Sequence, residues 1–496
     1  MTTITIHDTT ELIAALVDGG IGPGDILELD DGTYTGDFTS TIAGTEAAPI
    51  IIRPKNPGLV TIDGNLFIGG VWEHWYDLDF TDSNTDRYDW TAYDGIYMTQ
   101  VGTHIHGCRI TDVHNSGINW FGSGLGEVSE CVIYNNGCLF VDDSGHGHSI
   151  YTHNNLGGNR IIARNIVGNN LGDYSIQLYT SSTNLIKDYT ITGNIAQGDP
   201  VIVSACYGGV YDLIFEYNII FQDYLFLGRS DEISPFETGL VQYNHLVQMG
   251  EFQVSPTWNN LVEQNNTVYI PGHPDSRAGY TNVAYVETTW LTAFTKSARW
   301  LGAVTILNPS SNATVSVDFS SLLANGNYRL RNGQNMTETW DFTQAGAAIN
   351  VPMNIWTASH VIGGGDGENH LPVFGAFVIE STIITGETTW GHDTGVIETN
   401  IRDFAGNWTG TGGISGINDA EKIGLHAGDY MISEVVNTGV RTVELLQNNY
   451  DPAGDDVNLD YRHGATEVDC LAAAWNDYTV TFVSLGFVQI RLTSTL

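Results

Sequence analysis

The chain has 496 residues, a length that can bury a sizeable core and that suggests two or three domains. Its formal net charge of −39 at pH 7 would repel a phosphate backbone, so the composition argues against nucleic acid as a partner. An acidic polysaccharide would also be repelled unless an arginine or a divalent cation reversed the field locally, and an acidic surface that only keeps the protein soluble explains the charge equally well.

The first predicted element is a short amphipathic helix over residues 10–17, with Thr9 or Thr10 as its N-cap and Gly19 near its C-cap. In a fold of stacked strands, such a helix covers the open end and protects exposed strand edges. Turn residues then separate short β-rich runs, up to the string from Pro49 to Gly64.

Similar β-rich segments recur after this string, and each is followed by a second β-rich run and an asparagine-containing turn. The second residues of the segments are Ile96, Ile118, Ile150, Ile176, Ile202 and Phe226, at intervals of 22, 32, 26, 26 and 24. These spacings are typical of one turn of a right-handed parallel β-helix, in which stacked coils bury each other's apolar side. We therefore expect stacked parallel strands from residue 50 to about 270, with the aligned residues inside.

Two kinds of internal column are expected in this solenoid. Cys108 and Cys131 are 23 residues apart and fall at the same place in consecutive coils, which predicts an internal stack. With Cys138, Cys206 and Cys470 they form no C-x-x-C pair, so we expect mostly reduced, buried thiols. The turn asparagines, which we interpret as a structural ladder of amides, are Asn115, Asn135, Asn165, Asn194, Asn218, Asn244 and Asn266.

The coil pattern lapses from about Trp300, where short alternating strands predict an antiparallel β-sandwich. We divide the chain into a parallel β-helix with its N-terminal cap (1–280), a β-sandwich module (281–381) and a C-terminal β-sandwich accessory module (382–496). The fold class is thus all-β.

The N-terminal helix, the turn from Asp31 to Tyr34 and the string from Pro49 to Gly64 together resemble the start of polysaccharide lyases of the chondroitinase B and alginate lyase type. These belong to the pectate-lyase-like superfamily of right-handed parallel β-helix proteins. The resemblance implies this fold and a polysaccharide partner. The catalytic lysine and arginine motif of those lyases has no match in this sequence, so the resemblance does not identify the active site.

Candidate site residues follow from the strand period, because side chains alternate between the two faces of a strand. If the aligned residues face inward, two outward columns result. The first is Tyr97, Asn119, Tyr151, Gln177, Val203 and Leu227, and the second is Thr99, Phe121, His153, Tyr179, Ala205 and Arg229. Aromatic and polar side chains about 4.8 Å apart suit a bound sugar chain.

The longest interval contains a stretch rich in histidine and aspartate, from Val141 to Asn155. Histidine and tyrosine are suited to proton abstraction next to a carboxylate and to protonation of a leaving oxygen. We predict Tyr151, His153, His148 and Arg229 as catalytic residues, with Arg229 neutralising a uronate. The predicted substrate-binding residues are Tyr97, Asn119, Phe121, His146, Gln177 and Tyr179. Alternatively, the histidines only satisfy hydrogen bonds in an insertion loop.

The turn carboxylates Asp142, Asp143 and Asp173 offer oxygen ligands for Ca²⁺, the one cofactor that the sequence suggests. They could also form a carboxylate pair for hydrolysis, or could simply stabilise turns.

Together these features predict an extracellular polysaccharide-cleaving enzyme, a lyase that acts by β-elimination on a uronate-containing glycan. The alternatives are a glycoside hydrolase with paired acids and a non-catalytic binder of the phage tail-spike or adhesin kind. The sequence contains no run that approaches 18 apolar residues, so it predicts no membrane-spanning helix. Although no secretory leader is visible, we expect a location outside the cell or on a cell or virion surface, reached by another route such as assembly into a virion, where a spike would be a trimer.

Overall fold

The computed structural model describes most of the N-terminal half of the chain and isolated segments of the rest. The described residues are 1–17, 20–83, 94–122, 124–137, 147–154, 157–168, 170, 174–180, 185–197, 201–205, 209–221, 224–227, 236–247, 251–254, 258–269, 285–287, 297–307, 313–320, 323–333, 338–353, 355–356, 374–381, 396–397, 430–437, 440–447, 479–484 and 488–495.

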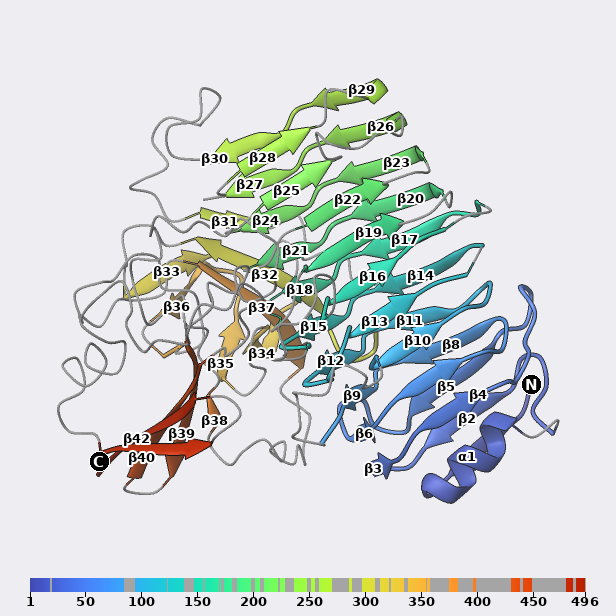
Figure 1. The fold of residues 1–496 in the computed structure, drawn as a ribbon, viewed down its shortest axis with the longest axis horizontal. Helices are drawn as coiled ribbons and strands as arrows, with labels where there is room; N and C mark the ends of the chain where they lie inside the picture. The colour runs from blue at the N-terminus through green and yellow to red at the C-terminus, as the bar shows by residue number, and fades with distance from the viewer. Residues whose placement is uncertain are drawn as a thin grey trace.

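The first part of the chain is a parallel solenoid with three strands in most coils, and Figure 1 shows the coils stacked from α1 (Thr9–Val17) at the blue end to the green strands at the other. Sheet A has the order β1 (Thr3–Ile6), β2 (Ile26–Leu29), β5 (Ile50–Pro54), β8 (Glu73–Tyr76), β11 (His104–His106), β14 (Gly126–Ser129), β17 (Arg160–Ala163), β20 (Ile186–Thr192), β23 (Val210–Glu216), β26 (Phe236–Gln242) and β29 (Trp258–Gln264). Sheet B has the order β3 (Gly32–Thr35), β6 (Val60–Asp63), β9 (Asp79–Thr81), β12 (Arg109–Thr111), β15 (Val132–Tyr134), β18 (Ile166–Gly168), β21 (Ile195–Gln197), β24 (Ile219–Phe221), β27 (His245–Val247) and β30 (Thr267–Tyr269). Sheet C has the order β28 (Glu251–Val254), β25 (Tyr224–Leu227), β22 (Val201–Ala205), β19 (Ile176–Thr180), β16 (Ile150–Thr152), β13 (Ile118–Trp120), β10 (Ile96–Met98), β7 (Leu66–Ile68) and β4 (Phe38–Ser40).

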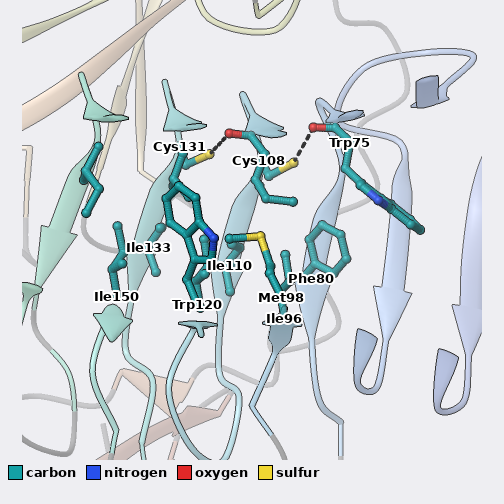
Figure 2. Packing of buried hydrophobic residues seen from close by; sticks show 14 of the residues in the cluster. Trp75, Phe80, Ile96, Met98, Cys108, Ile110, Trp120, Cys131, Ile133 and Ile150 are labelled. Atoms are coloured by element: carbon teal, nitrogen blue, oxygen red, sulfur yellow. Dashed lines mark hydrogen bonds between the residues drawn. The ribbon is translucent and has the colours of Figure 1, made fainter. Parts of the chain in front are cut away.

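The predicted inward column of sheet C is confirmed in its first coils. Ile96, Ile118, Ile150 and Ile176 pair in register and are at most 1% exposed. Figure 2 shows the packing of this core, with Ile96 and Ile150 near Met98 and Trp120.

The prediction for the later coils was wrong by one residue. Val201, not Ile202, pairs with Ile176, and Leu225, not Phe226, continues the column. Leu227, predicted to face outward, is fully buried. These strands contain consecutive apolar residues, so their sequence carries no alternation from which the inward phase could be read.

The corner between sheets A and B holds the predicted ladder. The side chain of Asn194 accepts from the backbone N–H of Asn165 and donates to the carbonyl of Ile162 in the preceding coil. Asn218, Asn244 and Asn266 repeat this pattern.

Cys108 and Cys131 occupy the same ladder position in earlier coils, as free, buried thiols. Their sulfur atoms point to the carbonyls of Trp75 and Ile105, also in the preceding coil (Figure 2). The predicted cysteine stack and the asparagine ladder are therefore one column. Cys138, Cys206 and Cys470 lie outside the described residues.

Two of the predicted ladder asparagines belong elsewhere. Asn115 lies in the turn between β12 and β13, and Asn135 donates to Asp112 at 2.6 Å. A second, shorter ladder runs through Asn136 and Asn170, since the backbone N–H of Asn136 donates to the side-chain oxygen of Asn170.

The N-terminal helix caps the solenoid as expected, but its N-cap is Asp8. The Asp8 carboxylate accepts from the N–H of Glu11, and the Glu11 side chain accepts from the N–H of His7. The first contact is an N-cap hydrogen bond, and the second extends it to the residue before the cap, in a variant of the capping box. Gly19 lies outside the described residues. No helix in the described part of the chain is long and apolar enough to cross a membrane.

The later strands form antiparallel sheets, as predicted. One sheet contains β31 (Tyr285–Glu287), β32 (Gly302–Leu307), β37 (Phe374–Ser381), β34 (Gly326–Asn332) and β35 (Thr339–Gln344), and β33 (Thr314–Val317) pairs with β36 (Ile349–Pro352). These strands share a separate buried core. The last sheet contains β38 (Val396–Ile397), β39 (Tyr430–Asn437), β40 (Val440–Gln447), β42 (Val488–Thr495) and β41 (Thr479–Ser484).

The segment before β32 is hydrogen-bonded to the corner between sheets A and B. Asp77 accepts from the hydroxyl of Ser297 at 2.6 Å, and Glu130 accepts from its N–H at 2.7 Å. Arg299 forms a buried ion pair with Asp79 of β9. Charged groups of the solenoid therefore hold the start of the antiparallel part.

Breaking the ladder should destabilise the solenoid. In Asn194→Ala the N–H of Asn165 loses its buried acceptor, which should lower the free energy of unfolding by about 1–3 kcal/mol. Urea denaturation measures this change. Asn56→Ala is the matched control, because Asn56 is exposed and its side chain contacts Asp31. Equal losses in the two variants would show that the ladder does not contribute.

Candidate functional site

The outward column of sheet C places four of the predicted site residues on adjacent strands. Tyr97, Asn119, Tyr151 and Gln177 pair directly across β10, β13, β16 and β19. The two tyrosines are partly exposed, whereas Asn119 and Gln177 are 9% and 6% exposed. Adjacent parallel strands set these side chains about 4.8 Å apart along the solenoid.

Aromatic rings form a continuous row along this column. Tyr97 stacks on Phe67 at 5.5 Å between ring centroids and meets Phe121 edge-on at 5.9 Å. Phe121 in turn contacts Tyr151 at 5.1 Å and His153 at 4.5 Å. The face therefore offers apolar rings with polar tips, a combination suited to sugar rings.

His148 lies deeper than the sequence suggested. It belongs to the stretch that the sequence could assign to an insertion loop, but it is fully buried, with its ring 5.2 Å from Tyr151 and stacked on Tyr174 at 5.4 Å. The backbone N–H of Tyr174 donates to Nδ1 of His148 at 3.1 Å. The neutral ring therefore carries its proton on Nε2.

His153 follows β16 and is half-buried. Burial, aided by the positive charge of Arg160, lowers the pKa of His153 to about 4. The imidazole is thus neutral above that pH, which is the protonation state that a general base requires.

Arg160, which the sequence did not single out, positions the ends of the two central strands. Its guanidinium donates to the carbonyls of Trp120 at 2.8 Å, His153 at 2.7 Å and Gly122 at 3.0 Å. It also lies 4.3 Å over the ring of Trp120. Because the ends of β13 and β16 are tied together, Phe121 and His153 are held side by side. A lone arginine at a strand start gives no sequence signal for this role.

Asp94, just before β10, is a second residue that the sequence did not indicate. Its carboxylate accepts from the side-chain amide of Asn119 at 2.8 Å and from the N–H of Ser116 at 3.1 Å. Burial raises the pKa of Asp94 to about 6, although both hydrogen bonds oppose this shift. A carboxyl that exchanges its proton near pH 6 is a candidate general acid or base. In sequence, Asp94 and Gly95 resemble an ordinary turn.

The remaining predicted residues divide into two groups. Tyr179 is half-buried near the end of β19 and pairs with Ser204. Five others lie outside the described residues and stay predictions: Arg229, His146, Asp142, Asp143 and Asp173.

Residues 94–268 match a sequence family described as the right handed beta helix region, which agrees with the parallel three-sheet solenoid. This part of the chain is therefore a right-handed parallel β-helix, the fold class of the pectate-lyase-like proteins that the N-terminal region resembles.

Solved structures similar to the chain include polysaccharide lyases. An alginate lyase from Paenibacillus sp. str. FPU-7 has 17% identity and a TM-score of 0.39, covering 56% of this chain and 97% of its own. A mannuronic acid specific polysaccharide family 6 lyase from human gut microbiota has 16% identity and a TM-score of 0.28, and the match covers 54% of this chain and 82% of the lyase. A pectate lyase has 11% identity and a TM-score of 0.34, and the match covers 56% of this chain and 78% of the pectate lyase. No curated protein matches the sequence.

The raised pKa of Asp94 predicts a pH dependence of stability. The folded protein keeps a proton that the unfolded chain releases, so stability should fall as pH rises from about 4 to about 6, by up to about 3 kcal/mol from this group. Asp94→Asn cannot ionise and should remove that part of the decrease. Urea unfolding at several pH values tests this. The exposed Asp31→Asn control should keep the wild-type slope, and an unchanged slope in Asp94→Asn would contradict the assignment.

Proposed function

We propose that the β-helix belongs to an extracellular polysaccharide-cleaving enzyme, a lyase that acts on a uronate-containing glycan by β-elimination. The observation that carries the proposal is the arrangement of Tyr151 and His153. Both side chains contact the ring of Phe121, and they lie at the end of one strand on a face lined with aromatic rings. The fold alone does not define the activity, since one scaffold serves many functions.

The chemistry of β-elimination assigns roles to these residues. One group removes the proton at C5 of the uronate, and another protonates the leaving glycosidic oxygen. The neutral imidazole of His153 is suited to the first step and the phenol of Tyr151 to the second. The negative charge that develops on the uronate carboxylate needs a nearby cation. We assign this role to Arg229, or to Ca²⁺ held by Asp142, Asp143 and Asp173.

A glycoside hydrolase is the second candidate, and Asp94 favours it. A carboxyl with a pKa of about 6 resembles the general acid of the two-carboxylate mechanism. Such an enzyme needs a second carboxylate, for which the predicted turn aspartates are candidates.

A panel of polysaccharides separates these functions. A lyase generates both reducing ends and the ultraviolet absorbance of an unsaturated product, whereas a hydrolase generates reducing ends alone. A glycan binder of the tail-spike kind would retain the polysaccharide without either signal. The last result would overturn the enzymatic proposal.

Substitutions at the two central residues should lower turnover without unfolding the protein. We expect Tyr151→Phe and His153→Ala each to reduce kcat by ~10²–10⁴-fold, because each removes a proton-transfer group. Tyr217→Phe is the matched tyrosine control, since Tyr217 is exposed at the opposite corner. Because the pKa of His153 is about 4, the acidic limb of kcat/KM should lie well below the ordinary histidine value. Near-normal turnover in both variants would move the chemistry to other residues, with the aspartates next.

A further inference from the structure

A second polar cluster lies on sheet A, away from the sheet C face described above. His74, His104 and Glu127 pair across the neighbouring strands β8, β11 and β14. His106 lies two residues beyond His104 and therefore on the same face of the strand. His106 is fully buried and Glu127 is 6% exposed, although both belong to the outward side of the sheet.

The cluster has the composition and spacing of a metal site. One ligand atom from each of His104, His106 and Glu127 lies within 4.8 Å of the other two. Zinc bonds of about 2.0–2.2 Å place tetrahedral ligand atoms about 3.4 Å apart, so small side-chain rotations would close the site. We propose that these three residues bind a divalent transition-metal ion, with zinc as the best match for two imidazoles and one carboxylate.

Neighbouring side chains already hold the two imidazoles in place. The hydroxyl of Ser129 lies 2.6 Å from Nδ1 of His106, and the ring of Tyr76 stacks on the same imidazole at 4.9 Å. The ring of His74 stacks on His104 at 4.0 Å and 9°. Such outer contacts orient metal ligands and are part of functional metal sites.

The local charge also favours a cation. Glu127 and Glu130 are both buried, and the guanidinium of Arg164 lies 4.0 Å from the first and 3.0 Å from the second. A single guanidinium is thus shared between two buried carboxylates. A divalent ion at Glu127 would add positive charge where desolvated negative charge is costly.

The position of the cluster suggests a structural role. Glu130, which follows β14, also accepts the N–H of Ser297, the residue that anchors the antiparallel part to the solenoid. An ion bound by β11 and β14 would tie two coils together beside this anchor. Metal binding would therefore stabilise the junction, independently of any catalysis on sheet C.

The test uses the full-length protein, treated with a chelator, dialysed and titrated with Zn²⁺ by calorimetry. We expect saturable binding with one ion at this cluster, and a higher Tm with zinc. His104→Gln and Glu127→Gln should each weaken that binding by at least ~100-fold, as the loss of a direct ligand exceeds the effect of outer contacts. The visible absorbance of bound Co²⁺ should be lost in the same variants. His7→Gln, at an exposed position, should bind like the wild type.

Circular dichroism of the metal-free variants separates lost binding from lost folding, and the fully buried His106 is left unchanged for this reason. Failure of the wild type to bind zinc would overturn the proposal. So would zinc affinity, Co²⁺ absorbance and Tm shift that persist in both His104→Gln and Glu127→Gln, since the ion would then bind elsewhere.

Discussion

The corner between sheets A and B is the constraint on which the solenoid depends. In each described coil from β8 onward, the chain turns with one residue in the left-handed region, followed by one whose side chain points inward. The left-handed residues are Asp77, Gly107, Glu130, Arg164, Gly193, Tyr217, Tyr243 and Asn265. A residue other than glycine costs about 1–2 kcal/mol in this conformation. From Cys108 onward, the inward residue offsets that cost by bonding backbone groups of the neighbouring coil, so the height of these coils is fixed at this corner.

Because this corner is constant, differences in coil length are accommodated at the other turns. Residues 112–117 separate β12 from β13, whereas residues 135–149 separate β15 from β16. The longer connection leads directly into the strand that carries Tyr151. The constant corner thus keeps sheet C in register, while the described end of the longer connection places His148 against Tyr151.

The same corner also joins the solenoid to the antiparallel part. Asp77 and Glu130 hold left-handed positions, and their carboxylates bind Ser297. Gly107 lies between them, and a Cβ there would come within 2.5 Å of the Ser297 hydroxyl and 2.2 Å of the Asp77 carboxylate. The glycine therefore serves both the turn and the close approach of the linker. The proposed metal cluster lies next to this junction. One region of sheet A therefore contains the left-handed turns, the contacts to Ser297 and the buried carboxylates.

The sequence determined the periodic features of the protein. The coil spacing, the ladder of Asn194 and its neighbours, and the row of Tyr97, Asn119, Tyr151 and Gln177 follow from local repetition, and the N-terminal cap follows from the amphipathic pattern of residues 10–17. Repetition failed where a strand is apolar on both faces, which displaced the column by one residue at Val201. Only the tertiary structure could reveal the raised pKa of Asp94, the clamp at Arg160 and the histidine cluster of sheet A. Their properties arise from burial and from contacts between coils, and these particular residues recur at no fixed spacing along the chain.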